Sequence, residues 1–300
     1  MPEFDSVTLK DPSSPMTATF VPMAGMIATS LADGEDEFLG QRRGLNAYVN
    51  NGKTMGIPIL YPWANRLSAN TYEVDGAVVT LTADTNGVRA DAHGAPIHGV
   101  LAADPGWLAT ARSDNELTAT LDYGGQPRLL ASFPFPHVLT QHVALSDRTL
   151  TISTTVLPTT AAPVPLCFGY HPYLRIPGVP RAEWLLSTPG MRHLLVDDFG
   201  IPTGEHEVWD GHTEPLTTTE YDDGFDGVPA GAVFSIAGGD RRVDVTYEAG
   251  YPAAQLFAPG NDDVIGIEPM AAPTDALRRG GYRLAVAGKP ATARFSIKVT

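Results

Sequence analysis

The two residues best suited to acid–base chemistry are a histidine and a glutamate that lie far apart in the sequence. His171 stands between Tyr170 and the pair Pro172-Tyr173, which would fix its orientation and offer aromatic faces to a ligand. Glu268 ends an apolar run, where burial would raise the pKa of its carboxyl group towards the range of a general base. A histidine that donates a proton and a carboxylate that accepts one would form a working pair. Taken singly, each could equally be structural or simply solvated.

Three further polar residues occur in turn-rich or aromatic-flanked segments. Arg66 follows Pro62-Trp63-Ala64-Asn65, and His98 lies between Ile97 and Gly99. Asp222 belongs to an acidic run with Asp223 and Asp226, so the choice among these three aspartates stays open. An ordinary surface arginine, a core histidine and a solvated acidic run are the structural alternatives.

Several enzyme signatures are absent from the sequence. It has no G-x-S-x-G elbow, no H-E-x-x-H zinc motif, no glycine-rich phosphate loop before a helix and no paired cysteines. None of these motifs can therefore be the source of the chemistry, which is left to the polar side chains above.

Composition narrows the class of partner. The 300 residues carry 34 acidic against 20 basic side chains, a net charge of -14, which disfavours nucleic acid, anionic membranes and, more weakly, phosphorylated metabolites. No apolar stretch is long enough to span a bilayer, and the acidic N-terminal residues do not resemble a secretory signal. The single Cys167 suits a reducing compartment, so we expect a cytoplasmic protein. The negative net charge favours a small neutral molecule as the ligand. We expect a monomer or homodimer.

The elements that must position these residues read as short β-strands. With 30 glycines and 26 prolines, the chain has little room for long helices. Alternation predicts a first strand at residues 17–23, a strand at Glu116–Asp122 and a hairpin of residues 138–145 and 149–157. Further strands are expected at residues 232–236, 242–248, 253–257, 264–268 and 291–299. Residues 40–58 read as turns, residues 177–229 as acidic loop, and residues 274–279 as one helical turn. We predict a single all-β domain over residues 1–300, a large antiparallel β-sandwich.

Together these segments resemble the aldose 1-epimerase (galactose mutarotase) family. The matching pieces occur in family order: Asn65-Arg66-Leu67, His98-Gly99, Gly169-Tyr170-His171-Pro172-Tyr173, Asp222 before Phe225, and Glu268-Pro269. Val100 stands where many galactose mutarotases have a second glycine, which leaves the preferred sugar open.

The resemblance implies a galactose mutarotase-like supersandwich with a sugar site in an open cleft. It implies Glu268 as general base and His171 as general acid, with Arg66, His98, Asp222, Asn65 and Tyr173 binding the sugar and His98 near the ring oxygen. The reaction would interconvert the α and β anomers of a free aldohexose and would require neither a metal ion nor an organic cofactor. We expect the acid and base to face each other across a hollow that admits a pyranose, and neighbouring carboxylates to keep His171 protonated.

Two alternatives remain at this stage. A hexose-6-phosphate 1-epimerase would need a basic cluster for the phosphate, and Arg42-Arg43, Arg241-Arg242 and Arg278-Arg279 are scattered through an acidic chain. A non-catalytic carbohydrate-binding module would keep an aromatic platform of Trp63, Tyr170 and Tyr173 without needing the proton-transfer pair.

Overall fold

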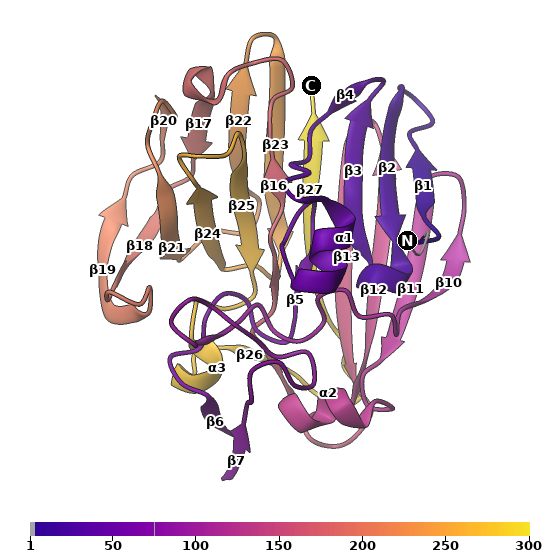
Figure 1. The fold of residues 1–300 in the computed structure, drawn as a ribbon, viewed down its shortest axis with the longest axis vertical. Helices are drawn as coiled ribbons and strands as arrows, with labels where there is room; N and C mark the ends of the chain where they lie inside the picture. Colours follow the sequence, from indigo (N-terminus) through magenta and orange to yellow (C-terminus); the bar gives the residue numbers. More distant parts are fainter. Residues whose placement is uncertain (1–3, 75) are drawn as a thin grey trace.

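A computed structural model describes residues 4–74 and 76–300. Two extended antiparallel sheets dominate it (Figure 1). The long sheet has the order β10 (Leu108–Arg112), β11 (Glu116–Asp122), β12 (His137–Ser146), β13 (Thr149–Pro158), β27 (Ala291–Val299), β23 (Arg241–Ala249), β22 (Ala232–Gly238), β17 (Leu185–Thr188), β20 (His212–Pro215).

The second sheet carries Tyr173, Asp222 and Glu268, and His171 lies between two of its strands. Its order is β19 (Pro202–Trp209), β18 (Met191–Val196), β21 (Tyr221–Asp226), β24 (Ala253–Ala258), β25 (Ile265–Met270), β15 (Gly169–Tyr170), β5 (Ile59–Leu60), with β16 (Tyr173–Leu174) also paired to β25. We call this the site sheet.

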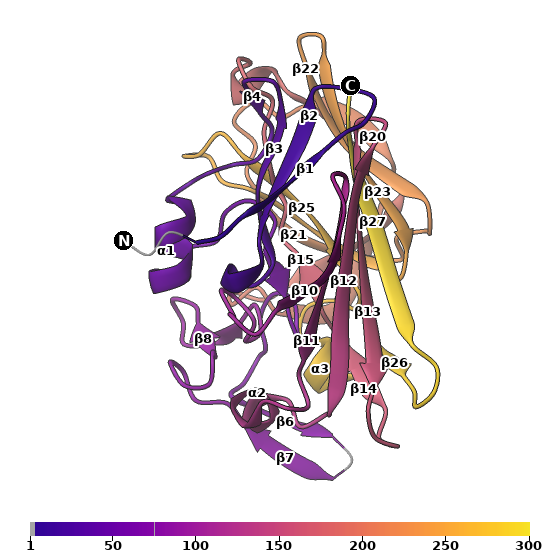
Figure 2. The ribbon, with the colours of Figure 1, turned by 90° about the vertical axis from the view of Figure 1, so that its right-hand side faces the viewer.

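An N-terminal sheet continues the layer of the site sheet. It consists of β1 (Val7–Lys10), β2 (Met16–Val21), β3 (Ile27–Asp33) and β4 (Asp36–Glu37). Isolated bridges, Ala28 to Ile57 and Leu39 to Leu174, join the two sheets. In Figure 2 the N-terminal sheet lies on one side of the long sheet of β12, β13 and β27, which gives the molecule its two layers.

The remaining elements are short. Strand pairs form from β6 (Thr71–Val74) and β7 (Ala77–Thr80), from β8 (Arg89–Ala90) and β9 (Pro96–Ile97), and from β14 (Val164–Leu166) and β26 (Arg283–Ala285). The helical segments are α1 (Gly44–Asn51), α2 (Pro127–Ser132), α3 (Ala276–Arg279) and the single 3₁₀ turns η1 (Pro22–Ala24) and η2 (Arg181–Glu183).

The space between the layers is filled by alternating apolar side chains. In β13, Leu150, Ile152, Thr154 and Val156 are completely buried, and the residues that alternate with them, Thr151, Ser153 and Thr155, are partly exposed. Phe295 on neighbouring β27 packs its ring 5.1 Å from that of Tyr170. Burial of this alternating face confirms the predicted all-β sandwich and the β12–β13 hairpin, whose register pairs Ser146 with Thr149.

Three sequence expectations are wrong. A strand, β1, precedes the one expected at residues 17–23, and residues 40–58 include the helix α1. Residues 177–229 hold β17 to β21 rather than loop. Much of β19 and β20 is exposed, so these strands lack the apolar alternation that marks a half-buried strand. Within the described residues, no helix has the length and apolar character that crossing a membrane requires.

Candidate active site

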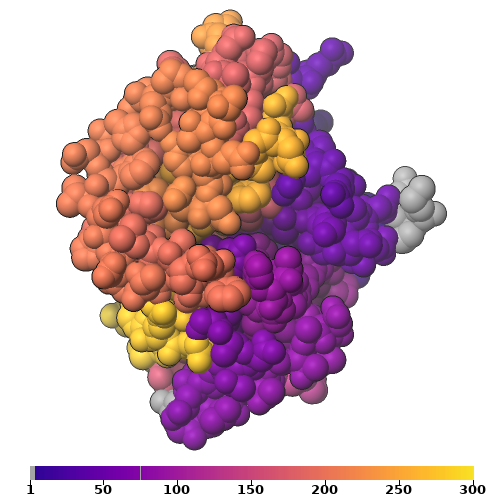
Figure 3. Space-filling view, turned by 60° about the vertical axis from the view of Figure 1, so that its left-hand side comes forward, coloured from indigo at the N-terminus to yellow at the C-terminus, as the bar shows by residue number. Residues whose placement is uncertain are grey.

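A cleft of about 210 Å³ gathers side chains from across the chain. Figure 3 shows the N-terminal part, in indigo and violet, meeting the orange segments on one face of the molecule. All seven predicted site residues line the cleft: Asn65, Arg66, His98, His171, Tyr173, Asp222 and Glu268. It is also lined by Arg42, Thr54, Ile97, Gln255 and Phe257.

Strand register places the histidine and the glutamate together. β15 and β16 pair with the same strand, β25, through Gly169 with Met270 and Tyr173 with Gly266. Position 171, between these two short strands, therefore comes level with position 268. Nε2 of His171 lies 3.1 Å from Oε1 of Glu268, and both side chains are almost completely buried. The two groups touch directly, which corrects the expectation that a hollow separates them.

Two aromatic rings contact the imidazole of His171. The ring of Tyr173 stacks on it at 4.0 Å, and the ring of Phe257 meets it edge-on at 5.5 Å. Tyr173 is in turn fixed by a 2.6 Å hydrogen bond between its hydroxyl group and that of Thr54. A Cβ atom on Gly266 would lie only 2.9 Å from Cε1 of His171, so glycine is needed there.

Trp63, Tyr170 and Tyr173 do not form an exposed aromatic platform for a sugar. Trp63 and Tyr170 are buried in the core, where the Tyr170 hydroxyl group hydrogen-bonds to Thr154. Tyr173 lines the cleft but is 2% exposed, with His171 stacked on its ring and the Arg42 guanidinium 4.7 Å from the ring centre. Its contacts suit it to positioning His171 rather than to stacking on a sugar.

Arg66 and His98 come from two loops that pair with each other. The backbone N–H of His98 donates to the carbonyl of Asn65, and both residues have left-handed backbones, with φ of 61° and 53°. The next residue, Gly99, lies so close to the backbone of Tyr61 that a Cβ atom there would fall 2.0 Å from the Tyr61 carbonyl oxygen. Such strained conformations recur at functional sites.

Carboxylates fix the guanidinium of Arg66. Its Nε donates to Oδ2 of Asp91 at 2.9 Å, and Nη2 lies 3.7 Å from Oδ2 of Asp222. Asp222 also accepts a 2.8 Å hydrogen bond from Nε2 of Gln255.

The structure separates the three candidate aspartates. Asp222 lines the cleft, whereas Asp223 pairs with His193 and Asp226 with Arg192. Alternation along β21 places Asp222 beside the cleft, because its partner in β24 is Phe257, another cleft residue.

Burial dominates the electrostatics of the touching pair. It raises the pKa of Glu268 well above its ordinary value, and Asp222 adds to this while Arg66 opposes it. Burial also lowers the pKa of His171 well below its ordinary value, with His98 and Arg42 acting in the same direction. Burial therefore favours a neutral histidine beside a protonated glutamate, which is opposite to the expectation of a protonated His171.

His98 is neutral as well. Burial, followed by the charges of Arg66 and Arg89, lowers its pKa to about 3. Its Nδ1 atom is buried and has no hydrogen-bond partner among the described residues. A neutral imidazole with an unsatisfied ring nitrogen suits hydrogen bonding to a ligand better than donation of a proton as a cation.

With this geometry in view, comparison with known families identifies the chain. The profile of the family described as aldose 1-epimerase matches residues 5–288. The chain belongs to the aldose 1-epimerase family.

Relatives of this family member agree in fold. The uncharacterized protein YihR of Escherichia coli K12 is 26% identical over 251 residues, covering 80% of this chain and 77% of that protein. The Slr1438 protein of Synechocystis superimposes with a TM-score of 0.80 at 22% identity, covering 100% of this chain and 96% of the other. A galactose mutarotase-like protein of Clostridium acetobutylicum gives 0.83 at 15% identity, with 99% and 96% covered. These structures share the supersandwich fold with the epimerase-family chain.

Sequence reasoning missed several residues that line the cleft of this family member or support its side chains. Asp91 lies in a loop, where nothing marked it as the partner of Arg66, and Gln255 and Phe257 looked like ordinary positions of a strand. Arg42 and Thr54 fell in the segment read as turns. One signal could have found Gln255: if the strands at 253–257 and 264–268 are assumed to pair as a hairpin, Gln255 comes opposite Glu268. No group of side chains suited to holding a metal ion occurs among the described residues.

Proposed function

We propose that this protein interconverts the α and β anomers of an aldohexose by acid–base opening and reclosing of the pyranose ring. The observation that best supports this is the contact between His171 Nε2 and Glu268 Oε1 in a cleft lined by hydroxyl-binding groups. The anomeric hydroxyl oxygen and the ring oxygen are bonded to the same carbon. An acid and a base that serve them at the same time must therefore lie close together.

In ring opening, Glu268 would take the proton of the anomeric hydroxyl group while His171 protonates the ring oxygen. The O–H electron pair becomes the second bond of the aldehyde, and the bond between the anomeric carbon and the ring oxygen breaks towards the ring oxygen. Rotation about the neighbouring carbon–carbon bond presents the other aldehyde face, and reclosure reverses both transfers. Each assisted proton transfer contributes on the order of 10²–10⁴-fold in rate.

The pair needs only one proton between its two members. Ring opening starts from the ionised form, carboxylate and imidazolium, and leaves the neutral form, carboxylic acid and imidazole. Ring closing uses the neutral form and regenerates the ionised one. Burial favours the neutral form of the pair. Sugar hydroxyl groups and Arg66, which lowers the pKa of Glu268, would favour the ionised form once substrate is bound.

The other cleft residues would hold the sugar hydroxyl groups. Arg66 offers a fork of donors fixed by Asp91, Asp222 accepts hydrogen bonds, and Gln255 orients Asp222. His98 and Asn65 would complete the set from the two paired loops. Which hydroxyl each one meets depends on the pose of the sugar.

The test is polarimetry of freshly dissolved α-glucose and α-galactose, with each uncatalysed rate subtracted. We expect acceleration by the wild-type protein and loss of about 10²–10⁴-fold of it in Glu268→Gln, because glutamine cannot take up the proton. Glu73→Gln, at an exposed position on β6, is the matched control and should keep full activity.

Two results would count against the proposal. Undiminished turnover in Glu268→Gln would remove that residue from its role. A wild-type protein that sugars protect against heat, but that does not speed mutarotation, would be a carbohydrate-binding module instead.

A further inference from the structure

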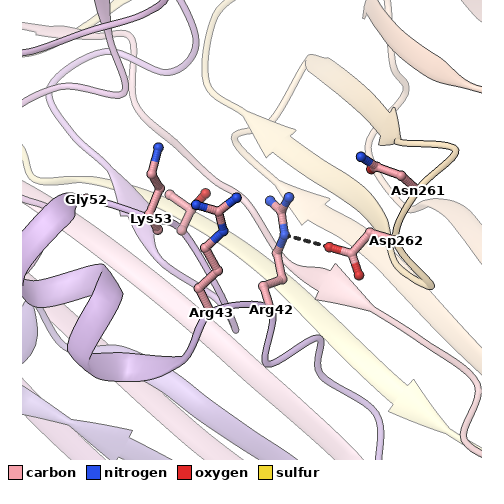
Figure 4. Close-up of a pocket in the computed structure, with 7 residues that line it drawn as sticks. Arg42, Arg43, Gly52, Lys53, Asn261 and Asp262 are labelled. Carbon is pink, nitrogen blue, oxygen red and sulfur yellow. Dashed lines mark hydrogen bonds and ion pairs between the residues drawn. The ribbon is translucent and has the colours of Figure 1, made fainter.

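A basic pocket opens directly beside the sugar cleft and has no part in the mechanism above. Its volume is about 600 Å³, and it is lined by Arg42, Arg43, Gly52, Lys53, Thr54, Asn261 and Asp262. Figure 4 shows the side chains of Arg42, Arg43 and Lys53 extending towards the same space, with Asp262 across from them. Three cations against one carboxylate is an unusual balance in a chain of net charge -14.

Most of the positive charge in this pocket is not neutralised by the protein. Nε of Arg42 donates to Oδ2 of Asp262 at 3.0 Å, which engages one of the donor groups of that guanidinium. Arg43 and Lys53 form no ion pair with any described residue. A further cation, Arg89, lines an adjoining cavity of about 350 Å³ that also includes Lys53 and Thr54. Uncompensated like charges repel, so a bound anion would stabilise this arrangement.

The basic pocket meets the cleft on the side of His171. Arg42 and Thr54 line both hollows. The Arg42 guanidinium lies over Tyr173, Thr54 hydrogen-bonds to the Tyr173 hydroxyl group, and Tyr173 stacks on His171. A ligand in the cleft could therefore extend one substituent past these side chains into the basic pocket.

We propose that the pocket of Arg42, Arg43 and Lys53 binds an anionic substituent on the carbon next to the sugar's ring oxygen, so that the substrate is a charged aldose. This inference rests on the proposed function, which assigns His171 to the ring oxygen. The anion cannot be at the anomeric position, because the reaction needs a free hydroxyl group there. In a hexopyranose the exocyclic sixth carbon is bonded to the ring carbon that adjoins the ring oxygen, on the side that His171 would face.

The other arginine pairs of the sequence do not offer this site. Arg241 and Arg242 pair with Asp36 and Asp244, and Arg279 pairs with Asp275. None of these arginines lines the cleft or the basic pocket. The structure thus isolates Arg42-Arg43 from the scattered pairs and adds Lys53, which its place in the sequence did not connect with them.

The first experiment compares kcat/KM for D-glucose, D-glucose 6-phosphate, D-glucose 6-sulfate and D-glucuronate, each corrected for its own uncatalysed mutarotation. We expect at least a 10-fold preference for one of the anionic sugars over glucose, declining as salt is raised. Phosphate carries two charges on a tetrahedral group, sulfate one on a tetrahedral group and carboxylate one on a planar group. The three arms therefore separate charge from shape. A preference for glucose over all three would overturn the inference.

The second experiment removes the charge. In the double variant Arg43→Gln/Lys53→Gln, kcat/KM for the preferred anionic sugar should fall at least 10-fold further than that for glucose. The control Arg112→Gln/Lys298→Gln removes the same charge at exposed positions far along the chain, on β10 and β27. It should leave the preference unchanged. Equal losses on charged and neutral sugars, or equal effects of both double variants, would contradict the pocket's role.

Calorimetric binding separates failure of this inference from failure of the proposed function. If no sugar is turned over, the epimerase proposal fails. Binding of glucose 6-phosphate that is at least 10-fold tighter than that of glucose, and that Arg43→Gln/Lys53→Gln abolishes, would then still support an anionic ligand. If glucose is turned over and the anionic sugars neither bind more tightly nor react faster, only the basic-pocket inference falls.

Discussion

The buried position of Glu268 costs the fold stability. Its side chain is 2% exposed, and in the folded protein burial keeps its pKa well above the ordinary value of 4.5. In the unfolded chain it ionises near 4.5. Between these two pKa values unfolding releases a proton, so raising the pH favours the unfolded chain.

This predicts a stabilising substitution at the proposed catalytic base. Glu268→Gln should unfold at a higher denaturant concentration than wild type, and its advantage should grow between pH 5 and 8. The growth can reach at most about 1.4 kcal/mol per pH unit, because glutamine has no proton to lose. Urea unfolding at several pH values measures it, with Glu73→Gln at an exposed position as the control. A constant or shrinking advantage would show that Glu268 is ionised in the folded protein.

Residue types and the family resemblance together predicted seven members of the cleft, but they predicted neither the other five nor the contacts among them. His171 and Glu268 could be chosen from their flanking residues, whereas their direct contact follows from β15 and β16 pairing with the same strand. The same local argument failed for Tyr170. An aromatic residue beside a proposed acid looks like a ligand platform in the sequence, but strand alternation turns it into the core.

Among the elements, β25 does most to shape the site. Residues 266 and 268 lie on the same face of the strand, two positions apart, so one supports the imidazole from beneath while the other contacts it. The smallness of residue 266 is thus as much a part of the site as the carboxylate.

Gly266→Ala should therefore reduce activity through His171 rather than through unfolding. The added methyl group would displace the imidazole by some tenths of an ångström, and we expect kcat/KM for mutarotation to fall about 10²-fold. Gly190→Ala is the control, since no atom lies within 3.7 Å of a Cβ built there. Unchanged kcat/KM with an unchanged melting temperature would mean that His171 can shift without loss.

Strands with one buried face could be predicted from the sequence, whereas exposed strands could not. The β12–β13 hairpin alternates between buried and partly exposed residues, and it was predicted within a residue or two. β18 to β21 carry many charged and exposed side chains, and their hydrogen bonds to neighbouring strands leave no mark in hydrophobic patterning. Asp222 was consequently assigned to a loop, although it lies in a strand of the site sheet.

For the whole molecule, the sandwich core connects the long sheet to the site. Phe295 of the long sheet packs against Tyr170, the residue before His171, and against Tyr251. This contact crosses from one layer to the other. The position of the site sheet over the long sheet therefore depends on such interlayer rings.

Phe295→Ala should destabilise the fold by about 3–5 kcal/mol, because a fully buried ring is replaced by a cavity. Phe295→Leu, which keeps most of the volume, should cost well under half of that. Urea unfolding with a common m-value measures both. Similar losses in the two variants would show that the ring is not close-packed between the layers.

Net charge and local charge lead to different predictions for the ligand. The total of -14 favours a neutral partner, whereas the hollow beside the cleft gathers Arg42, Arg43 and Lys53, and charge acts on a ligand locally. These residues flank α1, a helix that was not predicted because residues 40–58 contain many turn-forming residues.

The direct contact between imidazole and carboxyl group has a consequence for exchange with bulk solvent. Each half of the proposed cycle passes one proton through the sugar from one partner to the other, and the next half returns it. The protein would then end every turnover in the protonation state in which it began. Such a catalyst needs no water chain to the surface and no buffer to recharge it, which fits a pair sealed almost entirely from water.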